Sequence, residues 1–435
     1  MNIPFTKYTL DNGLDVLIHE DHSLPIVAVN VWYHVGSKNE VPGRTGFAHL
    51  FEHLMFEGSQ HYDRGYFHPL QEAGAALNGS TNADRTNYWE VVPTNALDLA
   101  LWMESDRMGY LLPALTEAKF SNQRDVVLNE RRQNYENRPY GLAGMAIVSA
   151  LYPPDHPYHW LTIGAAEDIR AAHLDDVKAF FQRYYHPANA SLTLAGDVDA
   201  DMGILLADEY FSEVPAGEKP APLTLAAPAP PRDVKLVLED RVELPRLYMA
   251  WHSPALFAAD DAELDLVAEV LASGKTSRLY RALVYEQRIA TEVAASQNSR
   301  ELGSFFQIVA TAAPGRTLAE VERAIVKEIA ALLDRGPTAP EMERCLAQAE
   351  AHFLFRLQTV GGFGGKSDQL NAYNVFLGDP AYFGRDLDRY RNATADQLRA
   401  AAIKYLQPSA RVVLSVVPRG RVALALPGSA PVAVS

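Results

Sequence analysis

The segment Val177-Lys-Ala-Phe-Phe-Gln-Arg-Tyr-Tyr-His-Pro-Ala-Asn-Ala-Ser-Leu-Thr-Leu194 combines an amphipathic helix pattern, a proline break and a strand pattern. The same order returns in Leu398-Arg-Ala-Ala-Ala-Ile-Lys-Tyr-Leu-Gln-Pro-Ser-Ala-Arg-Val-Val-Leu-Ser415. A shift of 221 residues places Tyr184 on Tyr405, with a proline three residues later in each copy. Such self-similarity indicates a duplicated domain. We therefore expect two homologous halves.

A proline-rich stretch separates these halves. Residues 215–231 contain six prolines in 17 positions, which removes backbone donors and prevents a helix. The predicted organisation is an N-terminal α+β domain over residues 1–214, a linker over 215–231, a homologous C-terminal α+β domain over 232–420 and a tail over 421–435.

Strand patterns open each half, and longer helical patterns follow them. Because no strand-helix-strand period repeats, the order favours an α+β sandwich over a doubly wound sheet. We expect two α/β sandwich halves, each an antiparallel sheet packed with helices. The strand patterns are Leu14–Ile18, Ile26–Trp32, Val234–Leu238 and Leu247–Trp251.

The composition excludes several protein classes. The 435 residues are 48% hydrophobic and 21% charged, as in folded soluble proteins. A formal charge of −15 opposes nucleic-acid binding, and we expect no membrane span because no apolar run is long enough. Cys345 is the only cysteine, which excludes a disulfide framework and a cysteine-based zinc ribbon. The start shows no signal peptide, and the compartment, cytoplasmic or periplasmic, stays open because a chain that had lost its leader looks the same.

A short helix is predicted within Thr45-Gly-Phe-Ala-His-Leu-Phe-Glu-His-Leu-Met-Phe-Glu-Gly58. Thr45 is suited to cap this helix and Gly58 to end it. Its apolar residues follow the i, i+3, i+4, i+7 spacing of a buried stripe: Phe47, Leu50, Phe51 and Leu54.

The same helix carries metal-binding residue types. His49 and His53 are four positions apart, so both imidazoles lie on one face and can share a metal ion. Glu52 lies beside them, where it can act as general base on a metal-bound water. A hydrolytic zinc site needs a third protein ligand, and a second helical pattern, residues 117–133, contains Glu130.

The inverted His-x-x-Glu-His motif, followed after 76 residues by Glu130, resembles the pitrilysin and insulysin superfamily of inverzincins. The length and duplicated halves resemble its mitochondrial-processing-peptidase subfamily and bacterial relatives, over roughly residues 5–418. The resemblance implies that His49, His53 and Glu130 bind one Zn²⁺ per chain and that Glu52 is the base. Further segments that carry the resemblance are Leu77–Thr81, Asp84–Tyr88, His156–Tyr158 and Ser277–Tyr280.

The resemblance also implies a substrate-binding strand. Leu77–Thr81 resembles the family's edge strand, onto which a substrate peptide adds as a further strand, with Asn78 and Gly79 holding its main chain. Taken alone, without the resemblance, the pair Asn78-Gly79 favours a simple turn.

Two departures from the family pattern affect the site. Gln123 stands where many relatives have a second glutamate, so that carboxylate is absent or displaced to Asp125. Val284 and Thr291 stand where relatives often have an arginine and a tyrosine that contact substrate and the developing oxyanion. Neither residue can supply a charged donor. We expect a homologous partner chain without the zinc motif to supply this pair, the alternative being a register shift to Arg288 or Tyr285.

The short stretch Ser273–Thr276 replaces the long glycine-rich loop of non-catalytic subunits, so the chain resembles the zinc-carrying catalytic subunit of a bacterial two-subunit enzyme. In the second half, the zinc residues fall opposite Asp265, Ala268 and Glu269, which predicts chemistry in the first half only. Gly361–Ser367 lacks the strand and first glycine of a phosphate loop, and we interpret it as a flexible connection or helix break.

The predicted function is that of a zinc-dependent metalloendopeptidase. It hydrolyses peptides or unfolded segments inside a chamber that two chains close like a clam shell. One alternative is a core or scaffold subunit of a larger complex, and another is a peptide-binding subunit with weak turnover. An intact ligand set argues against a pure scaffold, which needs no converging metal ligands.

Overall fold

The computed structural model describes residues 2–434, which divide into two compact units. The first unit comprises the described residues up to Asn129, together with Leu161–Pro222 and His352–Arg385. The second comprises Glu130–Trp160, Leu223–Ala351 and the described residues from Asp386 onward. The first unit therefore contains a segment from the second half of the sequence, and the second unit contains a segment from the first half. This division differs from the domain boundaries predicted from the sequence, which assign each half to one domain.

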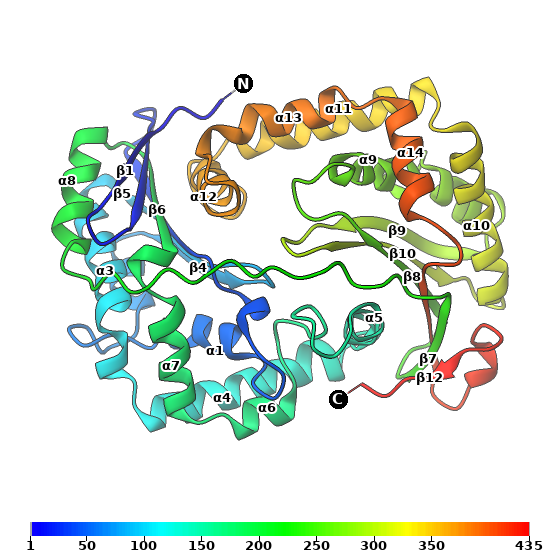
Figure 1. The fold of residues 1–435 in the computed structure, drawn as a ribbon, viewed down its shortest axis with the longest axis horizontal. Coiled ribbons are helices and arrows are strands. Elements are labelled where there is room, and N and C mark those ends of the chain that lie inside the picture. The colour runs from blue at the N-terminus through cyan, green and yellow to red at the C-terminus, as the bar shows by residue number, and fades with distance from the viewer. Residues whose placement is uncertain (1, 435) are drawn as a thin grey trace. The chain divides into compact units, whose positions relative to one another are not determined.

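A six-stranded sheet forms the centre of the first unit (Figure 1), in the order β1-β2-β6-β3-β5-β4. Neighbouring strands are antiparallel except β2 and β6, which are parallel. Strand β4 is an edge strand, so one side of its backbone has no neighbour in the sheet. The strands are β1 (Thr6–Thr9), β2 (Asp15–Glu20), β3 (Ile26–Tyr33), β4 (Ala76–Thr81), β5 (Thr86–Pro93) and β6 (Ala190–Gly196).

The second unit repeats the topology of β2 to β6 in the order β12-β7-β11-β8-β10-β9, with β12 from the C-terminal end of the chain in the outer position that β1 has in the first sheet. Strand β7 is parallel to β11 and to β12, whereas the other pairs are antiparallel. The sheets packed with helices are as predicted, and most of their strand pairs are antiparallel. Strands β6 and β11 return through helices to lie beside β2 and β7, which permits parallel pairing there. The strands are β7 (Val234–Asp240), β8 (Arg246–Ser253), β9 (Ala290–Asn298), β10 (Ser304–Ala312), β11 (Val412–Pro418) and β12 (Ala430–Pro431).

The helices confirm the duplication. Helices α7 and α14 begin at Leu174 and Ala395, 221 residues apart, and each leads into the central strand of its sheet. The helices of the first unit are α1 (Phe47–Leu54), α2 (Phe67–Glu72), α3 (Leu97–Ala114), most of α4 (Glu117–Arg131), α6 (Ala166–Ala171), α7 (Leu174–Tyr184), α8 (Ala200–Phe211) and α12 (Lys366–Leu377).

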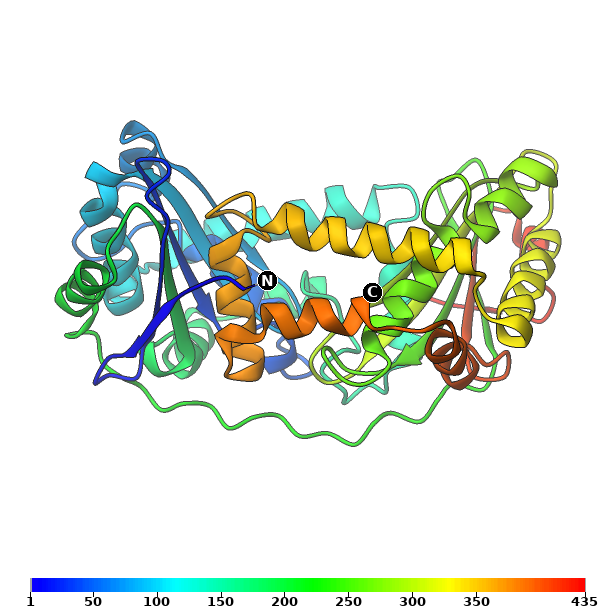
Figure 2. The same cartoon turned by 90° about the horizontal axis from the view of Figure 1, so that it is seen from above.

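Helix α12 lies alone against one face of the first sheet, opposite the face that α3 and α8 cover, as Figures 1 and 2 both show. Alternation along β3 explains this arrangement, because successive side chains point to opposite faces. Val29 and Val31 are fully buried in the core, whereas Asn30 and Trp32 donate to Asp368 at the start of α12. The second face of the sheet is thus polar and is matched by a polar helix.

The second unit packs its main core between the sheet and helices α9, α10 and α14, with Met249 and Trp251 of β8 in that core. Helix α5 packs on β8 and β11. No helix within residues 2–434 has the length and apolarity needed to cross a bilayer. The remaining helices are α5 (Ala143–Leu151), α9 (Asp261–Ala272), α10 (Leu318–Arg335), α11 (Ala339–Arg356), α13 (Phe383–Arg391) and α14 (Ala395–Tyr405).

Candidate metal centre

Helix α1 presents both histidines on one face. Its apolar stripe is buried as predicted, which leaves His49 and His53 half-buried. Their ring centroids are 4.9 Å apart and the rings are nearly perpendicular, at 86°. The helix ends at Leu54, so the expectation that Gly58 ends it is wrong; Gly58 follows four residues later with a φ of 106°, in a turn after the helix.

The start of α1 is held by a carboxylate that the sequence analysis missed. Glu40 accepts hydrogen bonds from the backbone N–H groups of Gly46 (3.0 Å) and Ala48 (2.9 Å). Thr45 does not cap the helix; its hydroxyl donates to Asp168 at 2.7 Å. Glu40 could have been recognised in the sequence as an acidic residue shortly before a predicted helix, because carboxylates stabilise free N–H groups at helix N-termini.

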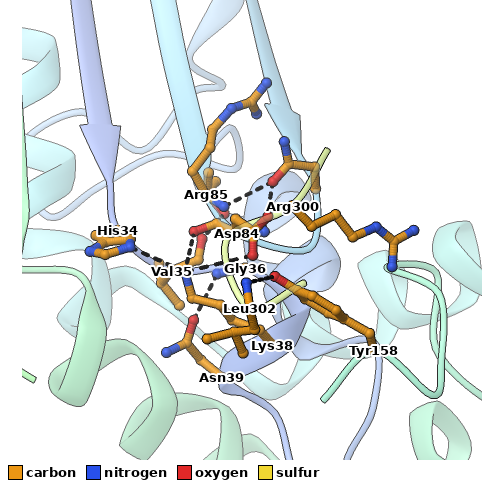
Figure 3. A network of polar contacts seen from close by, with 12 residues as sticks. His34, Val35, Gly36, Lys38, Asn39, Asp84, Arg85, Tyr158, Arg300 and Leu302 are labelled. Atoms are coloured by element: carbon orange, nitrogen blue, oxygen red, sulfur yellow. Dashed lines mark hydrogen bonds and ion pairs between the residues drawn. The ribbon is translucent and has the colours of Figure 1, made fainter. Parts of the chain in front are cut away.

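The segment Gly36–Glu40, which precedes α1, also binds the hairpin formed by β4 and β5. The backbone N–H groups of Ser37 and Lys38 donate to the carbonyls of Asn82 and Ala83, at 3.1 and 2.9 Å. The Lys38 ammonium donates to the Asp84 carbonyl at 3.0 Å (Figure 3). One short segment therefore sets the position of helix α1 relative to the edge of the sheet.

Glu130 is brought to the two histidines by helix α4. One ligand atom each of His49, His53 and Glu130 lies within 4.8 Å of the others. No other group of three or more metal-binding side chains was found within residues 2–434. Two imidazoles and one carboxylate form the donor set that zinc takes in hydrolytic sites, with a position left for water. The residues present thus fit one Zn²⁺ by chemistry and by proximity.

Glu52 lies on α1 three positions after His49 and is half-buried. Burial raises the pKa of Tyr88 and Tyr185 well above their usual range, and the negative charge of Glu52 contributes in the same direction. Both phenols therefore stay neutral near neutral pH.

Asn78 and Gly79 lie inside strand β4 and not in a turn; the hairpin turn follows at residues 82–85. Asn78 is exposed and pairs across the ladder with Trp89. Gly79 is buried, and a Cβ there would lie about 3.1 Å from the Phe56 ring, so close packing favours glycine. Their role toward substrate stays a prediction.

Gln123 donates a short hydrogen bond to Glu57 just beyond helix α1, whereas Asp125 is exposed. The carboxylate beside position 123 therefore belongs to Glu57. Sequence reasoning missed it because the two residues are 66 positions apart.

The second unit holds Val284 and Thr291, the positions at which the resemblance implies an arginine and a tyrosine. Val284 packs against the unit's apolar core, and the Thr291 hydroxyl donates to the Thr311 carbonyl at 3.4 Å. Tyr285 is 75% exposed, and Arg288 is exposed as well. Neither Val284 nor Thr291 presents a charged donor.

Two protein-family models match the chain. A family model described as insulinase (peptidase family M16) matches residues 15–154, which include the three converging residues. A second model, described as the peptidase M16 inactive domain, matches residues 171–349.

Individual relatives extend over most of the chain. The zinc protease PqqE of Helicobacter pylori is 31% identical over 366 residues, 82% of this chain and 81% of that protein. The mitochondrial-processing peptidase subunit beta of Caenorhabditis elegans is 26% identical over 243 residues, 56% of this chain and 51% of that protein. The crystal structure of a protease from Helicobacter pylori superposes with a TM-score of 0.85 at 26% identity, covering 95% of this chain and 100% of that one.

Proposed function

The chain belongs to the insulinase family of peptidases (M16), and from this premise we propose that it is a zinc-dependent metalloendopeptidase acting on peptides or unfolded segments. The observation that carries the proposal is the convergence of His49, His53 and Glu130, whose ligand atoms lie within 4.8 Å of one another. Relatives named zinc proteases support zinc as the metal.

In the proposed mechanism, His49, His53 and Glu130 hold the metal, and Glu52 handles protons. When bound, zinc supplies a Lewis acid that polarises the scissile carbonyl and makes water acidic. The Glu52 carboxylate accepts a proton from the attacking water and passes it to the leaving amine. Its place on the same helix as both histidines keeps this transfer short.

The unpaired edge of β4 is the proposed site for the substrate backbone. A peptide that adds to this edge forms main-chain hydrogen bonds whatever its sequence, which suits an enzyme for unfolded segments. Asn78 and Gly79 lie in the middle of this strand. The segment Gly36–Glu40, which binds both the hairpin and α1, keeps this edge aligned with Glu52.

A partner chain completes the proposed enzyme. Val284 and Thr291 supply no charged donor for the oxyanion, so we infer that a homologous subunit contributes one and that both chains close around the substrate. The same observation favours a second candidate, a zinc-containing peptide-binding subunit that turns over negligibly by itself. Cleavage of a mixed peptide pool by the pure chain, then with candidate partners, separates the two functions.

The base assignment is tested by Glu52→Gln, which removes the proton acceptor and keeps the side-chain volume. We expect unchanged zinc content and loss of chelator-sensitive cleavage by at least about 100-fold. A fully active variant refutes Glu52 as the base. Absence of zinc from the wild-type protein refutes the proposed zinc-dependent peptidase activity and favours the scaffold alternative.

A further inference from the structure

The glycine-rich loop between α11 and α12 lies directly on the first sheet. A Cβ at Gly361 would lie 2.5 Å from Val91 Cγ2 and 2.7 Å from Ala28 Cβ, so the loop backbone contacts β5 and β3 with no space for a side chain. This contact is on the face that carries α12. The predicted helix break is confirmed, because α11 ends at Arg356 and α12 begins at Lys366, and the loop at this break is packed on the first unit.

Hydrogen bonds fix the shape of this loop. The backbone N–H of Gly364 donates to Asp368 Oδ2 at 2.7 Å, and the N–H of Lys366 donates to the Thr359 carbonyl at 2.9 Å. Asp368 Oδ1 in turn accepts from Trp32 Nε1 at 2.8 Å and from Asn87 Nδ2 at 3.2 Å. Both oxygens of this carboxylate are thus engaged by the sheet and the loop.

The loop presents one aromatic side chain, Phe363, next to the edge strand. Its ring packs edge-on against Trp89 at a centroid distance of 5.4 Å and remains 51% exposed. Trp89 lies directly opposite Asn78 in the β4–β5 ladder, and Asn78 and Ala76 are exposed on the same face. Exposed residues of β4 and the exposed Phe363 ring therefore flank Trp89 on the same face of the sheet.

We propose that Trp89 and Phe363 form a specificity subsite for a large apolar or aromatic side chain of a peptide paired with β4. The proposal rests on the function proposed above. Side chains of such a peptide alternate between the two sheet faces, and those on the α12 face project beside Asn78. With strands about 4.8 Å apart, a large side chain leaning across Asn78 reaches the two rings, whereas alanine does not.

The charges around the rings favour apolar over basic side chains. The Arg85 guanidinium donates to the Ser80 carbonyl at 2.8 Å and lies 5.0 Å from the Trp32 ring centroid. Ser80 is on the same face as Asn78, so a fixed cation lies next to the subsite. The Arg85 cation disfavours a lysine or arginine of the peptide there, although the nearby Asp368 carboxylate offsets part of that repulsion.

The test uses three fluorescent peptides that differ at one position only, which is phenylalanine, alanine or arginine. The zinc-loaded protein, with its partner if one is needed, cleaves each peptide, and the three rates are compared. For Phe363→Ala we expect kcat/KM to fall about 10-fold on the phenylalanine peptide and less than about 2-fold on the alanine peptide. Phe363→Leu retains most of the preference. Phe355→Ala, which removes a 62% exposed aromatic residue from α11, is the matched control and leaves the profile unchanged.

Binding of the same fluorescent peptides to the Glu52→Gln protein separates this inference from the proposed function. Loss of phenylalanine preference in Phe363→Ala supports the subsite even where turnover is absent. An unchanged preference overturns the subsite while leaving a zinc- and Glu52-dependent peptidase intact. A shift in oligomeric mass caused by Phe363→Ala, without any change in peptide preference, assigns the ring to a subunit interface and also overturns the proposal.

Discussion

Glu40 accepts a hydrogen bond at 2.9 Å from the backbone N–H of Ala48, the residue immediately before His49. The first turn of α1 is thereby attached to the segment that also binds the β4–β5 hairpin. A buried carboxylate outside the motif thus sets the direction in which the two imidazoles point.

Replacing Glu40 by alanine removes the acceptor for two N–H groups of α1. We expect the unfolding free energy to fall by about 1–2 kcal/mol, the upper range for a lost helix cap, because both groups are buried. Zinc affinity is expected to fall roughly 10-fold, since partners that orient ligands affect affinity by this order. Thermal unfolding and chelator competition measure the two effects.

Glu72→Ala is the control for this experiment, because Glu72 is an exposed glutamate whose recorded ion pair is with exposed His68. It should change neither quantity measurably. Zinc affinity that is unchanged in Glu40→Ala would show that α1 holds its direction without this contact.

His53→Ala is expected to reduce bound zinc from about one ion per chain to below about 0.1, because two donors do not hold zinc in a hydrolytic site. His61→Ala is the matched control, since His61 contacts Asp106 outside the three-residue group and is 48% exposed. Metal analysis after dialysis measures both. Equal zinc in the two variants contradicts the ligand assignment.

Asp368→Asn tests the docking of α12. The amide has only one acceptor oxygen, so it cannot accept from both Gly364 and Trp32 as the carboxylate does. We expect a loss of about 1–3 kcal/mol in unfolding free energy, the cost of leaving buried groups unpaired, with faster hydrogen exchange in residues 366–377. Asp388→Asn, at an exposed position of α13, serves as control, and equal stability of both variants would show that the hydrogen bonds of Asp368 do not hold α12 on the sheet.

Asp265 predicts a pH dependence in the second unit. Burial raises the pKa of Asp265 to about 7, although Tyr390 donates to its carboxylate at 2.7 Å. Between the ordinary pKa of 3.8 and about 7, the unfolded chain loses this proton while the folded protein keeps it, so stability decreases as pH rises across this window.

Asp265→Asn removes this titration. Its unfolding free energy relative to wild type should therefore increase from pH 4 to pH 7, as measured by urea denaturation at each pH. Tyr390→Phe removes a donor that lowers the pKa of Asp265, so the decrease in stability should extend to higher pH than in the wild type. A difference between Asp265→Asn and wild type that is independent of pH rules out the raised pKa.

Local patterns were enough to predict the elements and the motif. The helix-proline-strand repeat and the buried stripe of α1 are encoded by residues within a few positions of one another, and the structure confirms both. The parallel pairing of β2 with β6 was not predicted, because it joins strands separated by about 170 positions in the chain.

The sequence alone determined that two copies of one fold exist and that His49 and His53 share a helix face, because helical spacing is a local property. The tertiary structure decided which distant groups meet: Glu40 at the start of α1, Glu57 at Gln123, and Phe363 on Trp89. These contacts depend on packing between elements far apart in the chain. Such packing is selected by shape, burial and hydrogen bonding in the folded state, and no periodicity in the chain records it.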